Sequence, residues 1–455
     1  MVRHNNQRSV FLAFVLATLI AVSRASGQEL PVALQAGNLP PNTAAMSPSS
    51  VEIEVGTLGG NKGLADWVSN EISLFEKSGQ GVTVRTVALD GLERDIYPIE
   101  TLPQLAENVF VIRSEMGYEP WYLAKKRLIV PINRFLPDPE LSTSDFYDAL
   151  WEPITLEGQL WGVPLCSRPD VLIFNRLIFR EEGIESPPQS WDDFVSYARR
   201  LTKDRDGDGQ IDQWGVRIDS SEFIIAYPLI SMIFQKGGQV IRNGRYSLED
   251  PVCEEAYNFW KEFVNSSGAC KIDGRDFSEA VRDNHYAMQI VHTRNVQWAQ
   301  RRSDLQLAYL PTWGKKVSFS ETNLYWAIRQ STPEKEKASW AFVKWMSRRD
   351  VSLPTQSIFR GWPCRKDFVE REDFRNLARK GPMDFDVLFR AQEFSADLGE
   401  QTVMHRLQAF DGFSKALQRG VLANQEFASV AGPAVREANA ICERLSVEDA
   451  DAIYK

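Results

Sequence analysis

The chain has 455 residues, 43% of them hydrophobic, and a formal net charge of -9. This length and this hydrophobic content are enough for about two to three packed domains. The negative balance offers no basic face for a phosphate backbone, so we expect no nucleic-acid partner.

Residues 1–25 have the parts of a secretory signal peptide. Basic residues precede an apolar run from Val10 to Val22, and the small residues Ser23 and Ala25 follow it. The run is short for a membrane span, although an uncleaved anchor is the alternative. No cysteine follows the cleavage point, so we expect no lipid anchor there. We predict a soluble protein, periplasmic or otherwise secreted, with residues 26–50 as a flexible leader rich in Pro, Ala and Ser.

From residue 51 the sequence alternates between strand and helix patterns. VEIEV at 51–55 alternates as a strand, and apolar residues recur at a helical period over 64–75. A second strand pattern, VTVRTVAL, covers 82–89, and a third, NVFVI, covers 108–112. Such βαβ alternation predicts an α/β fold on a mainly parallel, doubly wound sheet.

The alternation continues to the end of the chain. We expect an apolar strand over 162–175, in GVPLCSRPDVLIFN. Ser190 is the natural N-cap of the next helix, because prolines precede it and Asp193 stands at the third helical position. Over 337–350, apolar side chains share one helical face, which favours core packing for its tryptophans over a cofactor contact.

The chain contains five cysteines, an odd number that leaves at least one outside any pair within the chain. Export would permit disulfides. The segment between Cys253 and Cys270 has a helical period, and such a helix holds its ends roughly 15 to 20 Å apart. We therefore expect no disulfide between these two. The spacings match no zinc ribbon or CxxC redox site, so we expect buried thiols at Cys166, Cys253, Cys270, Cys364 and Cys442.

The stretch DRDGDGQIDQWG, from Asp204 to Gly215, has the spacing of a calcium loop. In an EF-hand, oxygen ligands alternate along the loop, a glycine makes the turn and a glutamate closes the shell. Here Gly209 makes the turn, but Gly215 stands where the glutamate would be. A structural calcium and a solvated acidic turn therefore both fit. The calcium ligands would be Asp204, Asp206, Asp208, the carbonyl of Gln210, and Asp212.

No catalytic motif stands out, because GxSxG, HExxH, GxGxxG and a complete P-loop are all absent from the sequence. For His285 and His292 we expect satisfied, partly buried side chains rather than a metal pair. The 13 Trp, 12 Tyr and 25 Phe are conspicuous, since several stand beside Gly and Pro where a loop is expected. Aromatic faces with polar rims suit sugars. Paired carboxylates for glycoside hydrolysis need not be adjacent in sequence, so an exported hydrolase is an alternative.

The order of these segments resembles the extracellular solute-binding proteins of family 1, the sugar-binding subunits of ABC importers related to maltose-binding protein. The central part, GVPLCSRPDVLIFNRLIFREEGIESPPQSWDDFVSYARRLTKDRDGDGQIDQWGV, is similar to the family's signature. That signature runs from a strand ending in Phe-Asn through a Pro-x-x-Trp-x-Asp turn to a helix ending in Leu-Thr and an acidic loop. PQLAENVFVIRSEMGYEPWYLAKKRLIVPINRFL, NHYAMQIVHTRNVQWA, STPEKEKASWAFVKWMSRRD and GWPCRKD resemble further segments in order. The chain departs in its long leader, at Cys166 and at Glu115.

The resemblance implies the type II periplasmic-binding-protein fold, in which two α/β lobes joined by hinge strands close on a ligand. The first lobe would comprise 51–163 and 312–362, and the second 164–311 and 363–455. The acidic loop would lie in the second lobe, so an ion there would be structural. No cofactor is required.

The resemblance also implies a binding protein rather than an enzyme. It would capture a sugar or oligosaccharide and deliver it, as a monomer, to the transmembrane subunits of an ABC permease. The alternatives are the same fold binding a non-sugar solute or serving a sensor, and an exported carbohydrate hydrolase. Trp362 is the strongest candidate contact, because Gly361 and Pro363 leave it little local core to fill. Carried over position by position, the ligand-binding residues, which the resemblance places on loops between the lobes, are Asn61, Glu115, Tyr118, Arg168, Tyr227, Trp298, Trp326 and Trp362.

Overall fold

The chain divides into two compact units, Met1–Ser47 and Pro48–Lys455, and every residue described below belongs to the second. Within the described residues, no helix is long and apolar enough to cross a membrane. The expected signal peptide and residues 26–49 of the leader lie outside them. The computed structural model describes residues 50–58, 62–89, 107–113, 123–219, 226–275, 280, 285–293, 296, 302–348, 362–367, 386–396 and 406–454.

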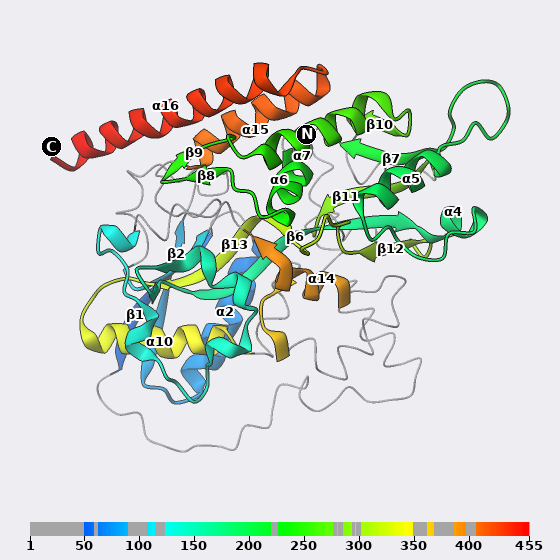
Figure 1. The fold of residues 1–455 in the computed structure, drawn as a ribbon. Coiled ribbons are helices and arrows are strands. Elements are labelled where there is room, and N and C mark those ends of the chain that lie inside the picture. Colours follow the sequence, from blue (N-terminus) through cyan, green and yellow to red (C-terminus); the bar gives the residue numbers. More distant parts are fainter. Residues whose placement is uncertain are drawn as a thin grey trace, which may run out of the picture. The chain divides into compact units, whose positions relative to one another are not determined.

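The first lobe is built on three parallel strands, as the alternating pattern predicted. β1 (Val51–Leu58) pairs in parallel with β2 (Val82–Leu89) and with β3 (Val109–Arg113). The helices α2 (Lys62–Lys77) and α10 (Pro333–Met346) pack against β1, although they are far apart in the sequence (Figure 1).

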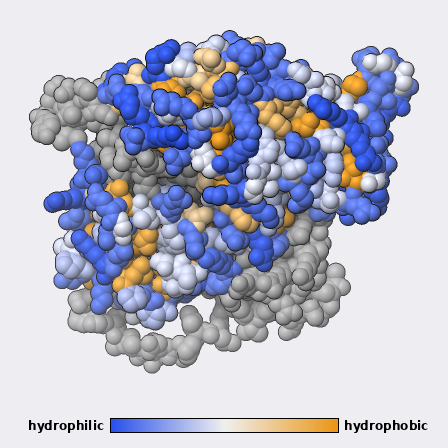
Figure 2. Space-filling model, viewed as in Figure 1, coloured by the Kyte–Doolittle hydropathy of each residue, from blue (hydrophilic) through white to orange (hydrophobic). Residues whose placement is uncertain are grey.

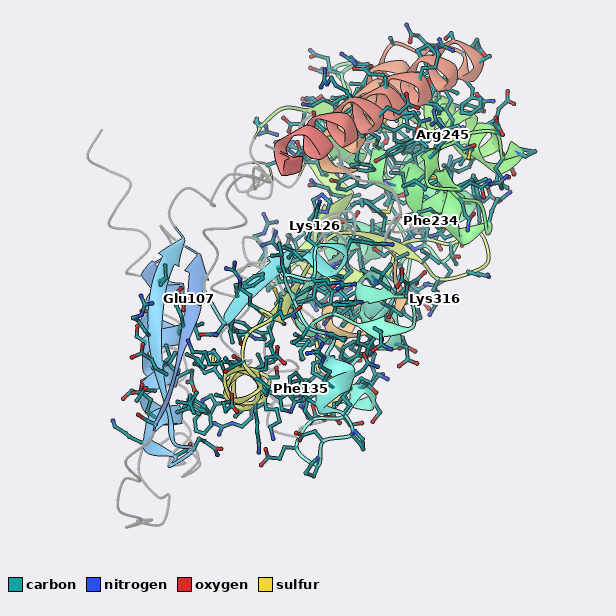
Figure 3. The ribbon with its side chains drawn as sticks, turned by 90° about the vertical axis from the view of Figure 1, so that its left-hand side faces the viewer. Glu107, Lys126, Phe135, Phe234, Arg245 and Lys316 are labelled. Carbon is teal, nitrogen blue, oxygen red and sulfur yellow. The ribbon has the colours of Figure 1, made fainter. Side chains whose placement is uncertain are left out.

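Aromatic side chains join α2 and α10. Phe75 of α2 packs edge-on against Phe342 and Trp345 of α10, with ring centroids 5.4 and 5.7 Å apart. Trp340 of α10 stacks on Phe135 at 5.2 Å, and Figure 3 shows Phe135 beside that helix. The helical period of this segment therefore marks core packing, as predicted.

Two long strands, β6 (Val163–Asn175) and β13 (Ser318–Ile328), run through both lobes. β6 pairs antiparallel with β13 along 163–169, and with β11 (Tyr286–His292) along 170–174. β13 also pairs antiparallel with β3. The strand order β10-β7-β11-β6-β13-β3-β1-β2 is therefore continuous.

The second lobe repeats the parallel arrangement. β7 (Trp214–Asp219) lies between β10 (Cys270–Asp273) and β11 and is parallel to both. β12 (Leu305–Ala308) pairs antiparallel with β6. The helices α5 (Trp191–Leu201), α6 (Ala226–Gln235) and α7 (Pro251–Ser266) contribute to the core of this lobe.

Helix α5 begins where the sequence predicted and is anchored by its first residue. The Ser190 hydroxyl accepts the backbone N–H of Asp193 at 3.0 Å, and the Asp193 carboxylate accepts that of Ser190 at 3.1 Å. Trp191 is fully buried, and its ring lies 6.0 Å from that of Trp260 on α7. Its Nε1 donates to Oε1 of Gln235 on α6 at 2.8 Å. The tryptophan of the Pro-x-x-Trp turn thus joins three helices.

The C-terminal part adds a helical pair, α15 (Arg406–Leu422) and α16 (Phe427–Tyr454), to the second lobe (Figure 1). The Tyr257 hydroxyl of α7 donates to the carbonyl of Gln425 at 3.1 Å. The remaining elements are β4 (Thr155–Leu156), β5 (Gln159–Leu160), α4 (Arg176–Glu181), β8 (Ile241–Arg242), β9 (Arg245–Tyr246), β14 (Trp362–Pro363), α14 (Asp386–Ala391), β15 (Ser395–Ala396) and the 3-10 turns Ile132–Phe135, Thr143–Asp145, Asp148–Leu150, Glu152–Ile154 and Gln392–Phe394.

Buried apolar side chains form two large clusters and a smaller one. The first-lobe cluster draws on residues between 53 and 166 and between 324 and 346, together with Cys364. The second-lobe cluster draws on residues between 172 and 319 and between 409 and 438. The small cluster surrounds β12, α14 and Trp362. The coloured surface in Figure 2 is mostly hydrophilic, with apolar side chains in small groups, as expected when such residues are largely buried. The lobe boundaries given above stay a prediction.

All five cysteines lie within the described residues; Cys166, Cys253 and Cys364 are buried as expected, whereas Cys270 and Cys442 are only partly buried. Cys253 lies in the first turn of α7 and Cys270 begins β10, which follows that helix; that these two are not joined stays a prediction. Burial raises the pKa of the Cys253 thiol to about 12 and that of Cys270 to about 11. Both thiols should therefore react slowly in the folded protein.

Candidate functional site

Strand β6 changes partners around Arg168, Pro169 and Asp170. Before these residues it pairs with strands of the first lobe, and after them with strands of the second. Arg168 and Asp170 are both buried. We call this segment the crossing point, because side chains from both lobes come together there.

A buried Asp–His pair joins two strands at the crossing point. Oδ1 of Asp170 and Nδ1 of His292 are hydrogen bonded, and the two residues stand opposite each other in the register of β6 and β11. The Ser318 hydroxyl of β13 accepts the backbone N–H of Asp170 at 2.9 Å and donates to its carbonyl at 3.0 Å. Asp170 therefore ties three strands together. Satisfied, partly buried side chains were expected for His285 and His292. His292 is satisfied and fully buried, whereas His285 is exposed, although its Nδ1 is hydrogen bonded to the carbonyl of Asp212 at 2.9 Å.

Tyr227 packs on this pair from the second lobe. Its ring centroid lies 4.9 Å from that of His292, 5.1 Å from Phe319 and 6.0 Å from Phe410. The sequence reading placed Tyr227 on a loop, and this is wrong, because the residue belongs to helix α6 and is 1% exposed. The tyrosine therefore supports the Asp–His pair from the core side.

Two fully buried hydroxyls flank the crossing point. Ser167 immediately precedes Arg168, and Thr293 immediately follows His292. Among the described residues, neither Oγ of Ser167 nor Oγ1 of Thr293 has a hydrogen-bond partner. Buried hydroxyls are normally hydrogen bonded. These two can therefore bind a water molecule or a polar group of a solute.

Trp362 lies in β14, opposite Ser167 in the register with β6. Its ring meets that of Phe389 at 5.3 Å in the small apolar cluster, and the residue is 6% exposed. The expectation that it has little local core to fill is wrong. Trp326 was also expected on a loop, but it lies inside β13, 1% exposed and edge-on to Phe342 at 6.2 Å. It belongs to the first-lobe core rather than to a surface that a solute could contact.

The structure thus brings three of the predicted residues, Arg168, Tyr227 and Trp362, to the crossing point. Sequence reasoning missed Asp170, Ser167 and Thr293, and it treated His292 only as a core histidine. No local signal identifies them, because their proximity depends on the register between strands distant in sequence. Four predicted residues lie outside the described part of the chain: Asn61, Glu115, Tyr118 and Trp298.

The acidic loop brings three carboxylates together. Oxygens of Asp204, Asp206 and Asp208 lie within 4.8 Å of one another. The two oxygens of Asp204 accept backbone N–H groups, from Gly209 at 2.8 Å and Gly207 at 2.7 Å. These bonds lower the pKa of Asp204. The loop therefore holds one carboxylate in its charged form and places two more beside it.

The other end of the loop departs from a full calcium loop. Oδ2 of Asp212 accepts the backbone N–H of Arg205 at 2.8 Å. A Cβ atom at Gly215 would collide with the carbonyl oxygen of Ala198 on α5. The close packing of β7 on α5 thus requires glycine, which explains why no glutamate stands at this position.

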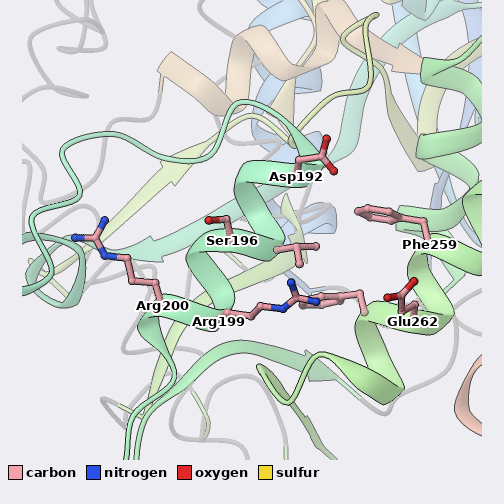
Figure 4. A pocket seen from close by; sticks show the side chains of 8 residues that line it. Asp192, Ser196, Arg199, Arg200, Phe259 and Glu262 are labelled. Carbon is pink, nitrogen blue, oxygen red and sulfur yellow. The ribbon is translucent and has the colours of Figure 1, made fainter.

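A separate pocket of about 620 Å³ lies between α5 and α7 (Figure 4). Val195, Phe259 and Phe263 supply its apolar lining, and Arg199 and Glu262 supply charges. No residue of the crossing point lines it. We therefore take the crossing point, not this pocket, as the candidate solute site.

Known proteins share this architecture. The sugar-binding protein MalE from Xanthomonas citri superposes with a TM-score of 0.71 at 16% identity, covering 88% of this chain and 99% of that one. UgpB from Mycobacterium tuberculosis, solved with glycerophosphocholine, gives 0.62 at 15% identity, covering 89% and 100%. The predicted two-lobed α/β fold of solute-binding proteins is therefore confirmed.

The family follows from the sequence comparison. Binding proteins of Brucella abortus and Brucella suis are 22% identical to this chain over 121 residues, which cover 26% of this chain and 28% of theirs. Residues 75–380, well over half of the chain, match the family described as bacterial extracellular solute-binding protein. The chain belongs to this family, whose members are binding proteins, and the resemblance drawn from the sequence is confirmed.

Proposed function

We propose that this protein captures a sugar or oligosaccharide and delivers it to the transmembrane subunits of an ABC importer. The observation that carries the proposal is the composition of the crossing point: two buried hydroxyls available for hydrogen bonding, the guanidinium of Arg168, and the nearby ring of Trp362. Hydroxyl groups and flat apolar faces are what a polyhydroxylated solute needs when it leaves water. The sugar-binding function of MalE, a protein of the same fold, supports this class of solute.

Closure would convert binding into transport. The lobes are joined through β6 and β13, so a rotation about the crossing point would enclose the solute. Only the closed form would dock productively on the permease. In this proposal the protein acts as a monomer, requires no cofactor and releases the solute chemically unchanged.

A non-sugar solute is the second candidate, either for transport or for a sensor. Arg168 favours it, because a guanidinium binds a phosphate with two parallel hydrogen bonds. UgpB, of the same fold, was solved with glycerophosphocholine. An exported carbohydrate hydrolase is the remaining alternative.

A thermal-shift screen tests the proposal on the full chain, with mono- and oligosaccharides and glycerophosphodiesters as ligands. We expect a saccharide to raise the melting temperature, because a ligand that binds only the native state stabilises it by mass action. Calorimetry should then show weaker binding of that sugar to Ser167→Ala, and unchanged binding to the control Ser196→Ala on the exposed side of α5. Stabilisation by glycerophosphodiesters alone would establish the second candidate. Recovery of a hydrolysed sugar would overturn the binding-protein assignment.

We also propose a structural calcium ion in the acidic loop. Asp204, Asp206, Asp208, Asp212 and the carbonyl of Gln210 would supply its ligands, and the convergence of the first three supports it. Calcium should raise the melting temperature of the wild type but not that of the double variant Asp206→Asn/Asp208→Asn, with the same preference for solutes in both. A wild type that responds to neither calcium nor a chelator would show that the loop is a solvated turn.

The remaining proposals concern the compartment of the mature protein and its further contacts with the ligand. We propose that residues 1–25 are removed on export, so that the mature chain begins near Ser26 and enters the soluble exported fraction. Recovery only with membranes after a carbonate wash would contradict this. Further proposed ligand contacts are Asn61, Glu115, Tyr118 and Trp298.

A further inference from the structure

Cys166 and Cys364 lie in the same buried cluster of the first lobe. Cys166 stands on β6 just before the crossing point, and Cys364 follows β14; they are 0% and 2% exposed. β14 pairs antiparallel with β6, and its register places Pro363 opposite Cys166. The two cysteines are therefore offset by one residue across a pair of neighbouring strands.

This register brings the two Cα atoms within the range of a disulfide. Opposed residues of antiparallel strands have Cα atoms about 5 Å apart, and one step along the chain adds about 3.8 Å in a nearly perpendicular direction. The Cα atoms of Cys166 and Cys364 are thus about 6 Å apart, and disulfides join residues at about 4.4 to 6.8 Å.

Both side chains also belong to the same buried cluster. β14 ends at Pro363, so Cys364 leaves the strand, and its side chain packs in the cluster that contains Cys166. Burial raises the pKa of the Cys364 thiol, and a charge on Cys166 raises it further. Cys166 is therefore near enough to influence the Cys364 thiol electrostatically.

We propose that Cys166 and Cys364 form a disulfide bond after export. This bond would link residues 362–367 covalently to β6. The family is extracellular, and disulfides form and persist in such compartments. The link would hold β14, and with it Trp362, against Ser167. This inference goes beyond solute binding and is independent of the solute.

The bond would form by thiol–disulfide exchange with a disulfide oxidant, either a protein disulfide or oxidised glutathione. The thiolate of one cysteine attacks the oxidant, which forms a mixed disulfide and releases the first oxidant thiolate. The thiolate of the second cysteine attacks the mixed disulfide, forms the Cys166–Cys364 bond and releases the second oxidant thiolate. Two electrons and two protons pass from the protein thiols to the oxidant. Because both thiols are buried in the fold, this exchange takes place before 362–367 docks on β6.

Mass spectrometry of the full chain tests the proposal. The protein is exported, or refolded with reduced and oxidised glutathione, then denatured without reductant and alkylated with iodoacetamide. We expect alkylation of Cys253, Cys270 and Cys442, and one linked peptide pair that is two hydrogens lighter than its reduced form. Alkylation of all five cysteines, or a link that involves another cysteine, would overturn the proposal.

Stability provides a second readout. A reductant should lower the melting temperature of the wild type and of the control Cys253→Ser, but not that of Cys166→Ser or Cys364→Ser. The double variant should be no less stable than either single variant, because each removes the same bond. An equal effect of reductant on all these proteins would contradict the link. If the serine variants fail to fold, the mass measurement on the wild type decides alone.

Discussion

Asp170 links three strands, because this residue of β6 is hydrogen bonded to His292 of β11 and to Ser318 of β13. Asparagine keeps the volume of its side chain but loses the charge that faces His292. Because both side chains are buried, we expect Asp170→Asn to lower the free energy of unfolding by about 1 to 3 kcal/mol. Urea unfolding measures this loss, and Glu185→Gln, on the exposed surface, serves as the matched control. An Asp170→Asn variant as stable as that control would show that the pair contributes little.

Substitution of Trp362 distinguishes a role in core packing from a role in solute binding. Because its ring is buried against Phe389, we expect Trp362→Ala to cost about 3 to 5 kcal/mol of stability. If the indole also stacks on the solute, affinity falls by roughly 1 to 3 kcal/mol. Trp362→Phe keeps an aromatic ring and is the matched comparison. Calorimetry that shows unchanged affinity, with a large fall in melting temperature, would make Trp362 a core residue and remove it from the site.

At the scale of one helix, the N-cap of α5 is expected to contribute measurably. Ser190→Ala removes the acceptor for the Asp193 N–H and should cost about 1 kcal/mol. Ser196→Ala changes the same residue type on the exposed side of the same helix and should be close to neutral. Thermal unfolding of the two variants compares them directly. Equal melting temperatures would show that the tertiary contacts of Trp191 fix this helix without its cap.

Elements with a local signal could be predicted from the sequence. The alternating run at 82–89 coincides with β2, and the cap at Ser190 coincides with the start of α5, because both depend on neighbouring residues only. The crossing point could not be predicted. Trp326 is of a residue type that suits sugar binding. It nevertheless lies in the core, because β13 pairs with β3 on one side and with β6 on the other. Likewise, the contact of Asp170 with His292 depends on a register between strands more than a hundred residues apart.

For the whole molecule, buried and bonded carboxylates predict acid sensitivity. Arg302 and Asn175 donate to Asp304 at 2.7 and 2.8 Å, and the bonds from Arg302 above all lower its pKa below the ordinary 3.8. Burial would raise the pKa of Asp138, but hydrogen bonds from Trp340 and Lys344 outweigh it and lower the value. A carboxyl group with a lowered folded pKa stabilises the fold above its unfolded pKa, and that contribution disappears as the pH falls through the folded pKa.

We therefore expect the free energy of unfolding to fall as the pH drops below about 4. Asp304→Asn should be less stable than the wild type near neutral pH, and the difference should narrow in acid. Urea unfolding across this pH range measures both effects, with Asp192→Asn, an exposed residue of α5, as the control. A difference that stays constant down to about pH 2 would show that the charge of Asp304 is not the cause.

Each core is assembled from stretches that are far apart in the chain. β3 gains its partner β13 only after more than two hundred further residues, and the second-lobe core is completed by α15 and α16. Loops of this length make the long-range pairings slow to form. A growing chain cannot close either core until most of it has been synthesised, so it stays open and unfolded for longer than a domain made of local contacts. The order of the strands thus delays folding in a protein whose family works outside the cell.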